Sequence, residues 1–448
     1  MIAFLIAIVA MLLMIAKWKT HPFLSIMLTA LILAVIAGIP ITQVPKVIGE
    51  GFSATFTSIG LVIIFGALIG SIIERTGAAL TLADTVIRII GRHRPALAIE
   101  LMGWVVSIPV FCDSGFVILN PIREALAKRT GASAVMLTVC LSCGLYVSHV
   151  FIPPTPGPIA AAEALGIGEN LLLVIALGAV VSIFPLTAGY FYARYISSRV
   201  TTGNNENTEA PDQTAEAYTR LRDTQPDRPG AIASLAPIII PIVLMSLSSI
   251  ASMLHLQGMP ADICVFIGHP LMALAVGVLA AICLLIRTRK TGELFTITDN
   301  TLRTVGPILF ITAAGSVLGR VIAASDLMQY ITQKAPLLNN LGLLFPFLVA
   351  AVFKTAQGSS TVAITTTASL IAPLLPSLGL TTPSQAALAV LAIGAGATTV
   401  SHANDSYFWV VTRLGNLSVE QGYKTHTTCT LIIGFTSIIA IIIISQFV

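Results

Sequence analysis

Four side chains that could bind and release a proton lie inside otherwise apolar segments of this sequence: Asp113, His149, His402 and Asp405. A charge in such a segment is costly unless it has a partner or a purpose. Asp113 precedes Ser114 and Gly115, a pattern that suits a proton site and equally suits the cap of a helix. Each histidine could carry a proton, bind a substrate hydroxyl or satisfy a backbone carbonyl. No metal-ligand spacing surrounds these residues, so we predict no bound metal.

A run of small and hydroxylated residues, Gln357-Gly358-Ser359-Ser360-Thr361, interrupts another apolar segment. A helix that begins there would direct free N–H groups at an anion such as a carboxylate. Tight helix packing through small residues is the alternative. Lys354 and Arg320 could attract an anion, or their ends could extend to the membrane surface. The residues predicted to contact substrate are Ser114, Gly115, Thr155, Gln357, Gly358, Ser359, Ser360, Thr361, Asn404 and Ser406.

Two further apolar segments are broken by irregular runs. The first run, His149–Pro158, contains four prolines, which remove backbone donors and leave carbonyl groups free. The second run, Ser401–Ser406, carries more polar groups. Asn404 and Asp405 are predicted there as ligands for substrate hydroxyls or for a cation.

These features occur twice, in the same order. Gly70–Arg75 matches Gly315–Arg320, and the same register sets Ser114 against Ser359. After a small slip, Val147–His149 matches Val400–His402. Duplicated and interrupted helices in a membrane protein indicate the binding site of a transported substrate.

The composition requires lipid around most of the chain. Of 448 residues, 56% are hydrophobic and only 10% are charged, and the mean hydropathy is +0.92. A soluble domain usually has about 25% charged residues. We therefore predict an all-α polytopic membrane protein. The six cysteines are expected to be small buried side chains. No phosphate loop, no nucleophile–base motif and no basic patch with aromatic residues is present, so the sequence predicts neither an enzyme nor a nucleic-acid partner.

Basic residues cluster in alternate gaps between the apolar segments, which predicts that those gaps are cytoplasmic and that both termini lie on the outer side of the membrane. Segment 95–121 then enters and leaves on the cytoplasmic side as a re-entrant hairpin, and segment 341–378 does the same from outside. The matched spans run in opposite directions. We predict two inverted-topology repeats, 1–196 and 231–448, each with a re-entrant hairpin and a broken transmembrane helix, joined by a polar cytoplasmic linker at 197–230.

At these breaks the chain resembles the gluconate permease family of bacterial proton symporters. The resembling stretches are Ile108–Gly115, His149–Pro158, Ala356–Thr367 and Ser401–Trp409. Thr155 stands where a histidine is commoner in the family, and Glu74–Ala79 departs from its usual run. The resemblance implies a bacterial inner-membrane protein, proton coupling, and small hydroxylated monocarboxylates such as gluconate as substrates; one branch takes D-serine. It also implies a fold similar to the wider ion-transporter superfamily.

The sequence thus predicts a secondary symporter that uses the proton gradient and no cofactor. The substrate carboxylate would bind between the two hairpin tips, and Asp113 or the two histidines would exchange the proton. A sodium-coupled carboxylate symporter is the nearest alternative, with oxygen ligands from Asn404 and Asp405. An anion channel is the alternative from another class. The expected partners are the small anion and the lipid bilayer; a homodimer is an expectation by analogy alone.

Overall fold

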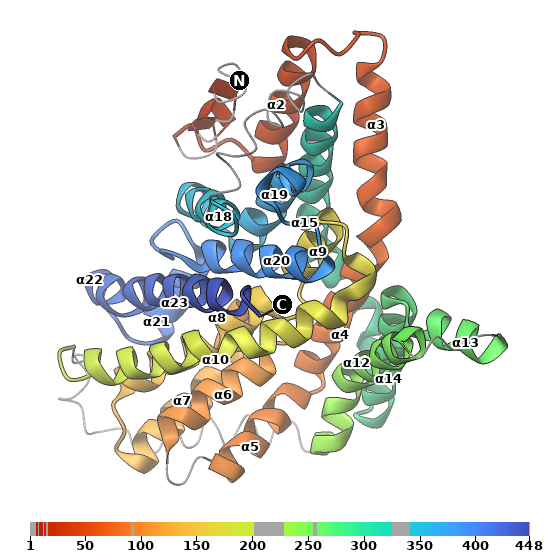
Figure 1. Ribbon diagram of the computed structural model, residues 1–448. Coiled ribbons are helices and arrows are strands. Elements are labelled where there is room, and N and C mark those ends of the chain that lie inside the picture. Colours follow the sequence, from red (N-terminus) through yellow and green to blue (C-terminus); the bar gives the residue numbers. More distant parts are fainter. Residues whose placement is uncertain are drawn as a thin grey trace.

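The computed structural model describes residues 6–7, 9–11, 13–14, 17–90, 94–200, 228–253, 258–324 and 341–447. Within these ranges every regular element is a helix (Figure 1). Among the described residues, six helices are long and apolar enough to cross a membrane, or seven if one bent pair is counted as a single span. The predicted all-α polytopic architecture is confirmed.

The first half of the chain contains α2 (Pro22–Ile36), α3 (Val44–Thr55), α4 (Leu61–Arg75), α5 (Ala78–Ile90), α6 (Pro95–Val106), α7 (Cys112–Thr130), α8 (Ala134–Phe151), α9 (Pro156–Ala164) and α10 (Leu171–Ile196). A π-helical turn, Phe56–Gly60, joins α3 to α4. The chain bends by 75° between α4 and α5.

The second half contains α12 (Ala231–Met253), α13 (Met259–Gly268), α14 (Pro270–Arg287), α15 (Leu294–Ala323), α18 (Leu344–Gln357), α19 (Ser360–Ile371), α20 (Pro383–Thr398), α21 (Ser406–Leu414), α22 (Val419–Gly422) and α23 (Thr428–Ile444). Short 3-10 turns at Gly168–Asn170, Thr291–Glu293, Ala372–Leu374 and Pro376–Leu378, and a π-helical turn at Tyr423–Thr427, complete the elements.

The helices form two groups that pack against each other (Figure 1). In the long-helix bundle, α15 packs along α2, α3 and α4, while α14 packs on α4 and α12. In the hairpin bundle, α8 packs between α6 and α10, and α20 packs between α18 and α23. The helix α19 bridges the groups, because it packs on α15 of the long-helix bundle and on α18 and α20 of the hairpin bundle.

The centre of the hairpin bundle is built from small residues. A Cβ atom added to Gly144 of α8 would come within 1.9 Å of the carbonyl oxygen of Glu100 on α6. A Cβ atom on Gly396 of α20 would come within 2.1 Å of the carbonyl oxygen of Phe347 on α18. The first arm of each hairpin therefore lies directly on a central helix, and these glycines set where the hairpin tips end.

The packing follows the order expected from the sequence repeat. α2 lies on α15 as α14 lies on α4, and the pair α6–α8 corresponds to the pair α18–α20. The inverted orientation of the repeats in a membrane stays a prediction. The second arm of the first hairpin continues beyond the expected limit at 121 to Thr130, where Gly131 ends it with a φ of 67°. Most of the expected linker, residues 201–227, lies outside the described residues.

Candidate functional site

The first hairpin tip spans residues 107–111, between α6 and α7. Ser107 closes it by donating a hydrogen bond to the carbonyl oxygen of Val110 at 2.9 Å. Asp113 lies in the first turn of α7, where its carboxylate accepts a hydrogen bond from the Ser406 hydroxyl at 3.1 Å. Because Ser406 opens α21 after the second helix break, this bond joins two predicted sites that are 293 residues apart.

The second hairpin tip turns at Gly358, whose φ of 87° favours glycine. A Cβ atom there would lie 2.1 Å from the carbonyl oxygen of Asn404, so the tip sits directly on the second break. Ser359 caps α19, because its hydroxyl accepts a hydrogen bond from the backbone N–H of Val362 at 3.3 Å. The last turn of α18 and the first turn of α19 therefore face the Ser401–Ser406 run.

A buried ion pair fastens this second tip. The ammonium group of Lys354 lies 2.5 Å from the Asp405 carboxylate, with side-chain exposures of 0% and 6%. It also donates to the carbonyl oxygen of Gly358. Breaking one partner of a buried pair leaves an uncompensated charge, which costs about 3–5 kcal/mol. The pair thus links the hairpin to the broken helix more strongly than a surface pair would.

A chain of polar groups extends from Asp405. Its second oxygen accepts a hydrogen bond from the backbone N–H of Tyr407 at 3.1 Å and so caps α21. Ser401 donates to the same carboxylate at 2.5 Å and lies 3.0 Å from a ring nitrogen of His426. The other ring nitrogen of His426 lies 2.8 Å from the Ser142 hydroxyl on α8. The network therefore reaches from the second break to a central helix of the first half.

The first helix break contacts the second hairpin. Thr155 closes the break by donating to the carbonyl oxygens of His149 and Ile152, at 2.9 Å each. A ring nitrogen of His149 lies 3.4 Å from the Thr361 hydroxyl on α19. The other ring nitrogen is buried and has no hydrogen-bond partner in the described part of the chain. Buried polar atoms are nearly always paired, so this nitrogen is a candidate for contact with a ligand.

The two histidines that match in the sequence repeat lie in different surroundings. His149 is buried, whereas His402 is half-buried, 3.3 Å from the carbonyl oxygen of Thr355. The amide of Asn404 is exposed and donates to the same carbonyl oxygen at 2.8 Å. His402 and Asn404 therefore both bind the backbone of α18, the first arm of the second hairpin, at Thr355. The side chain of Gln357 lies outside what the structure describes.

Sequence reasoning missed His426, Tyr407 and Ser142. Tyr407 donates to the carbonyl oxygen of Ser142 at 3.1 Å, and its ring centroid lies 5.3 Å from that of His426. A search for duplicated polar breaks could not find His426, because it belongs to neither break. Its sequence setting gave little signal, because His426 lies in the polar run Tyr423-Lys424-Thr425-His426-Thr427 that precedes the last apolar segment.

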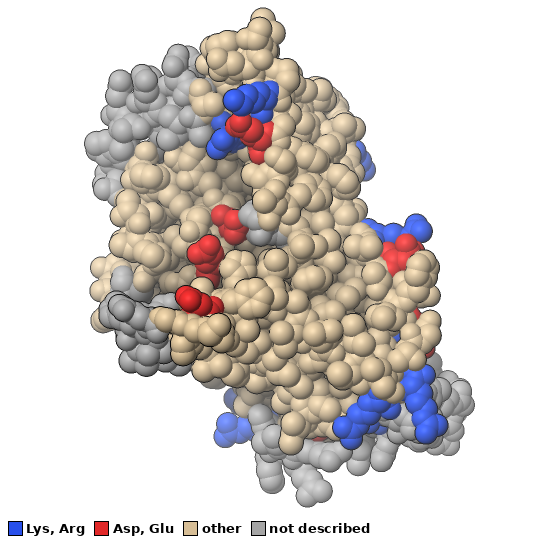
Figure 2. Space-filling model, turned by 90° about the vertical axis from the view of Figure 1, so that its right-hand side faces the viewer, with Lys and Arg blue, Asp and Glu red and all other residues tan. Residues whose placement is uncertain are grey.

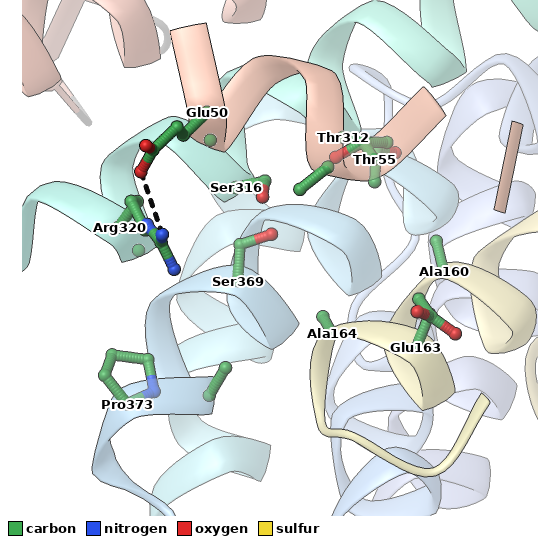
Figure 3. Close-up of a pocket in the computed structure, with 14 residues that line it drawn as sticks. Glu50, Thr55, Ala160, Glu163, Ala164, Thr312, Ser316, Arg320, Ser369 and Pro373 are labelled. Atoms are coloured by element: carbon green, nitrogen blue, oxygen red, sulfur yellow. Dashed lines mark hydrogen bonds and ion pairs between the residues drawn. The ribbon is translucent and has the colours of Figure 1, made fainter. Parts of the chain in front are cut away.

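Two cavities flank this cluster of tips and breaks. One, of about 420 Å³, lies between α4, the start of α15 and the first hairpin tip, and is lined by Ser114 and Phe111 among others. The other, of about 400 Å³, is enclosed by α3, α9, α15 and α19 (Figure 3). We call the first the inner cavity and the second the outer cavity, after the sides predicted from the basic loops. Figure 2 shows a hollow below a small group of basic and acidic side chains, on a face where charges form separate groups.

Comparison with known proteins adds three findings. The family model described as GntP family permease matches residues 1–448. The inner membrane permease YgbN of Escherichia coli is 33% identical and covers 96% of this chain and 95% of its own. The gluconate permease of Pseudomonas aeruginosa is 30% identical over 448 residues, 98% of this chain and 96% of its own. The structure of MtrF from Neisseria gonorrhoeae matches with a TM-score of 0.68 at 16% identity, over 96% of each chain, which indicates a shared fold.

Proposed function

Because the chain belongs to the GntP family of permeases, we propose that it is a proton-coupled uptake transporter for gluconate or a related small hydroxylated monocarboxylate. Its family members are permeases of the membrane and not enzymes. The substrate, the coupling ion and the direction of transport are the parts that we propose. In this proposal both termini face the periplasm of a bacterial inner membrane.

One observation carries the proposal: the two hairpin tips and the two helix breaks meet. Asp113 on the first hairpin contacts Ser406, and Lys354 on the second hairpin contacts Asp405. Thr361 at the second tip lies beside His149 at the first break. Irregular backbone at membrane depth is tolerated where protein or a water-filled cavity satisfies it. Such a meeting point is where broken-helix transporters bind substrate.

The chemistry of the meeting point suits a hydroxylated carboxylate. The first turns of α7 and α19 begin there, and their free N–H groups favour an anion. Ser114, Ser359 and Ser406 are partly buried or exposed, and Ser114 lines the inner cavity. Ser360 and Thr361, which follow Ser359 in the first turn of α19, are buried. We propose that the carboxylate lies at the helix starts and that the hydroxyls of these residues distinguish a sugar acid from a simple fatty acid.

The ion pair supports a proton rather than sodium as the coupling ion. The carboxylate of Asp405 already has the Lys354 ammonium at 2.5 Å and the Ser401 hydroxyl at 2.5 Å. An ammonium group in this position supplies the positive charge that a bound Na⁺ would supply. Asp113 has no such partner among the described residues and accepts only a neutral hydroxyl from Ser406 and a weak contact from Cys112. We therefore assign the transported proton to Asp113.

Uptake of labelled gluconate into proteoliposomes tests the proposal. A pH gradient, acid outside, should drive accumulation above the external concentration with or without sodium. Accumulation that requires a sodium gradient and ignores the pH gradient would favour the sodium-coupled alternative. Equilibration without accumulation under either gradient would favour a channel.

A further inference from the structure

An ion pair stands at the edge of the outer cavity. Arg320, near the end of α15, donates to the Glu50 carboxylate on α3 at 2.9 Å (Figure 3). The two helices approach closely here, because a Cβ atom on Gly51 would lie 2.8 Å from the Cα atom of Val317. The site described above does not use this pair.

A second ion pair of the same kind stands at the edge of the inner cavity. Arg75, the last residue of α4, pairs with Glu293, just before α15 begins. Each cavity therefore has an arginine from the end of one long helix and a glutamate from a neighbouring segment, the middle of α3 for Glu50 and the residue before α15 for Glu293. Arg75 and Arg320 are also the matched last residues of the duplicated Gly-Ser motif. An arginine–glutamate ion pair thus occurs at both cavities, with its arginine at matched positions of the sequence repeat.

Neither ion pair is suited to hold the bundle together. The side-chain exposures are 56% for Arg320 and 44% for Glu50, and 61% for Arg75 and 35% for Glu293. Exposed pairs contribute little to stability and exchange readily. A carboxylate that enters the cavity can replace the glutamate on the arginine while both glutamate oxygens turn to water. The exchange keeps the arginine paired.

The walls of the outer cavity suit the rest of a hydroxylated acid. Ser316 and Ser369 line it from α15 and α19, together with Thr312 (Figure 3). Thr312 donates to the carbonyl oxygen of Ile308 at 2.8 Å, and Ser369 donates to that of Thr365 at 3.0 Å. Because these hydroxyls donate to their own helices, their lone pairs are left to accept from a ligand. A volume of about 400 Å³ is within the range of small-molecule sites.

We propose that the outer cavity is an entry site for hydroxylated carboxylates, in which Arg320 receives the substrate carboxylate in exchange for Glu50. Arg75 and Glu293 perform the equivalent exchange on the release side. The inference rests on the proposed uptake of a sugar acid. Glu163 on the opposite wall of the outer cavity has no ion pair with Arg320 and repels an anion. It keeps the site weak, as a site of passage must be.

Initial rates of gluconate uptake into right-side-out vesicles test the entry site. R320Q should raise KM roughly tenfold with little change in the maximal rate, because the cation that attracts the carboxylate is gone. E50Q should lower KM two- to threefold, since Arg320 then has no competing partner. R320K should retain most of the affinity. The KM of the wild type should rise with ionic strength, whereas that of R320Q should not.

Matched controls separate this inference from a structural role. Arg303 and Asp299 form an exposed ion pair one turn apart on α15, outside both cavities, and R303Q should leave KM unchanged. If R320Q and E50Q shift KM in the same direction, or change only the amount of folded protein, the pair is structural and the inference fails. A wild type that accumulates no hydroxylated carboxylate would overturn the proposed function as well; a wild type that does, with R320Q unchanged, would overturn the entry site alone.

Discussion

Among single side chains, Lys354 and Asp405 differ from every exposed pair in the described part of the chain because water cannot replace either partner. With exposures of 0% and 6%, each charge depends on the other. Asp405 has a further task, because it caps α21. The two residues are 51 positions apart, and sequence reasoning gave them separate roles: one as an attractor of anions, the other as a ligand. Only the close approach of α18 to the second break shows that they act as a unit.

This coupling predicts a non-additive pair of substitutions. Lys354→Met or Asp405→Asn alone should lower the free energy of unfolding by about 3–5 kcal/mol, because each leaves one buried charge unpaired. The double variant should regain much of this loss, since no charge remains and asparagine is a good helix cap. Thermal unfolding in detergent measures the effect. A double variant whose loss equals the sum of the single losses would show that the two charges do not interact.

Asp113 predicts a separation of binding from coupling. Asp113→Asn keeps a group that accepts a hydrogen bond from Ser406, so the first tip should stay in place. It cannot release a proton. Exchange of labelled for unlabelled gluconate across the membrane should persist, while accumulation driven by a pH gradient should be abolished. Loss of both activities would assign Asp113 to substrate binding or folding and leave the proton carrier elsewhere.

Among the helices, the two hairpins show what could be predicted from sequence and what could not. Gly358 and Ser359 allowed the second tip to be predicted, because glycine favours a sharp turn and serine caps a helix. The four prolines between residues 153 and 158 likewise predict the first break, because proline cannot donate a backbone hydrogen bond within a helix. The end of α7 at Thr130 could not be predicted, because Pro121 lies inside the helix and suggested an earlier end. The role of His426 also depended on packing between distant helices.

The second tip predicts a strong effect of one methyl group. Gly358→Ala would force a positive φ on alanine and place a Cβ atom 2.1 Å from the Asn404 carbonyl oxygen. Since backbone cannot move aside cheaply, the tip should shift and uptake should fall at least tenfold. Gly131→Ala is the matched control, because Gly131 also has a positive φ of 67° but no atom lies within 4 Å of an added Cβ atom. This variant should lose only about 1 kcal/mol of stability through backbone strain. Equal uptake by the two variants would mean that the tip is not part of the site.

For the whole molecule, the two hairpins do not meet the long-helix bundle in the same way. Gly70 on α4 faces the first hairpin at its tip, where a Cβ atom would lie 1.9 Å from the carbonyl oxygen of Pro109. Its sequence counterpart, Gly315 on α15, faces Ser369 in the second arm of the other hairpin, at 2.7 Å. The inner cavity accordingly reaches Ser114 beside the first tip, whereas the outer cavity is lined by no residue of the second tip. The two hairpins are thus displaced unequally against the long-helix bundle, as expected for one end state of the alternating access that we propose.

This displacement predicts which tip is open to which side. In a protein whose six cysteines are replaced, a cysteine at Ser114 should react with a membrane-impermeant thiol reagent from the cytoplasmic side, and gluconate should protect it. A cysteine at Ser359 should react slowly from outside without substrate and faster during turnover, because transport brings the second tip to the outer cavity. A cysteine at Thr296, which lines the inner cavity from the long-helix bundle, should react from inside in every condition and serves as the control. Reaction of the Ser114 variant from outside would reverse the orientation assigned from the basic loops. Reactivity at 359 that is independent of turnover would contradict movement of the hairpin bundle, because a fixed tip cannot change its exposure.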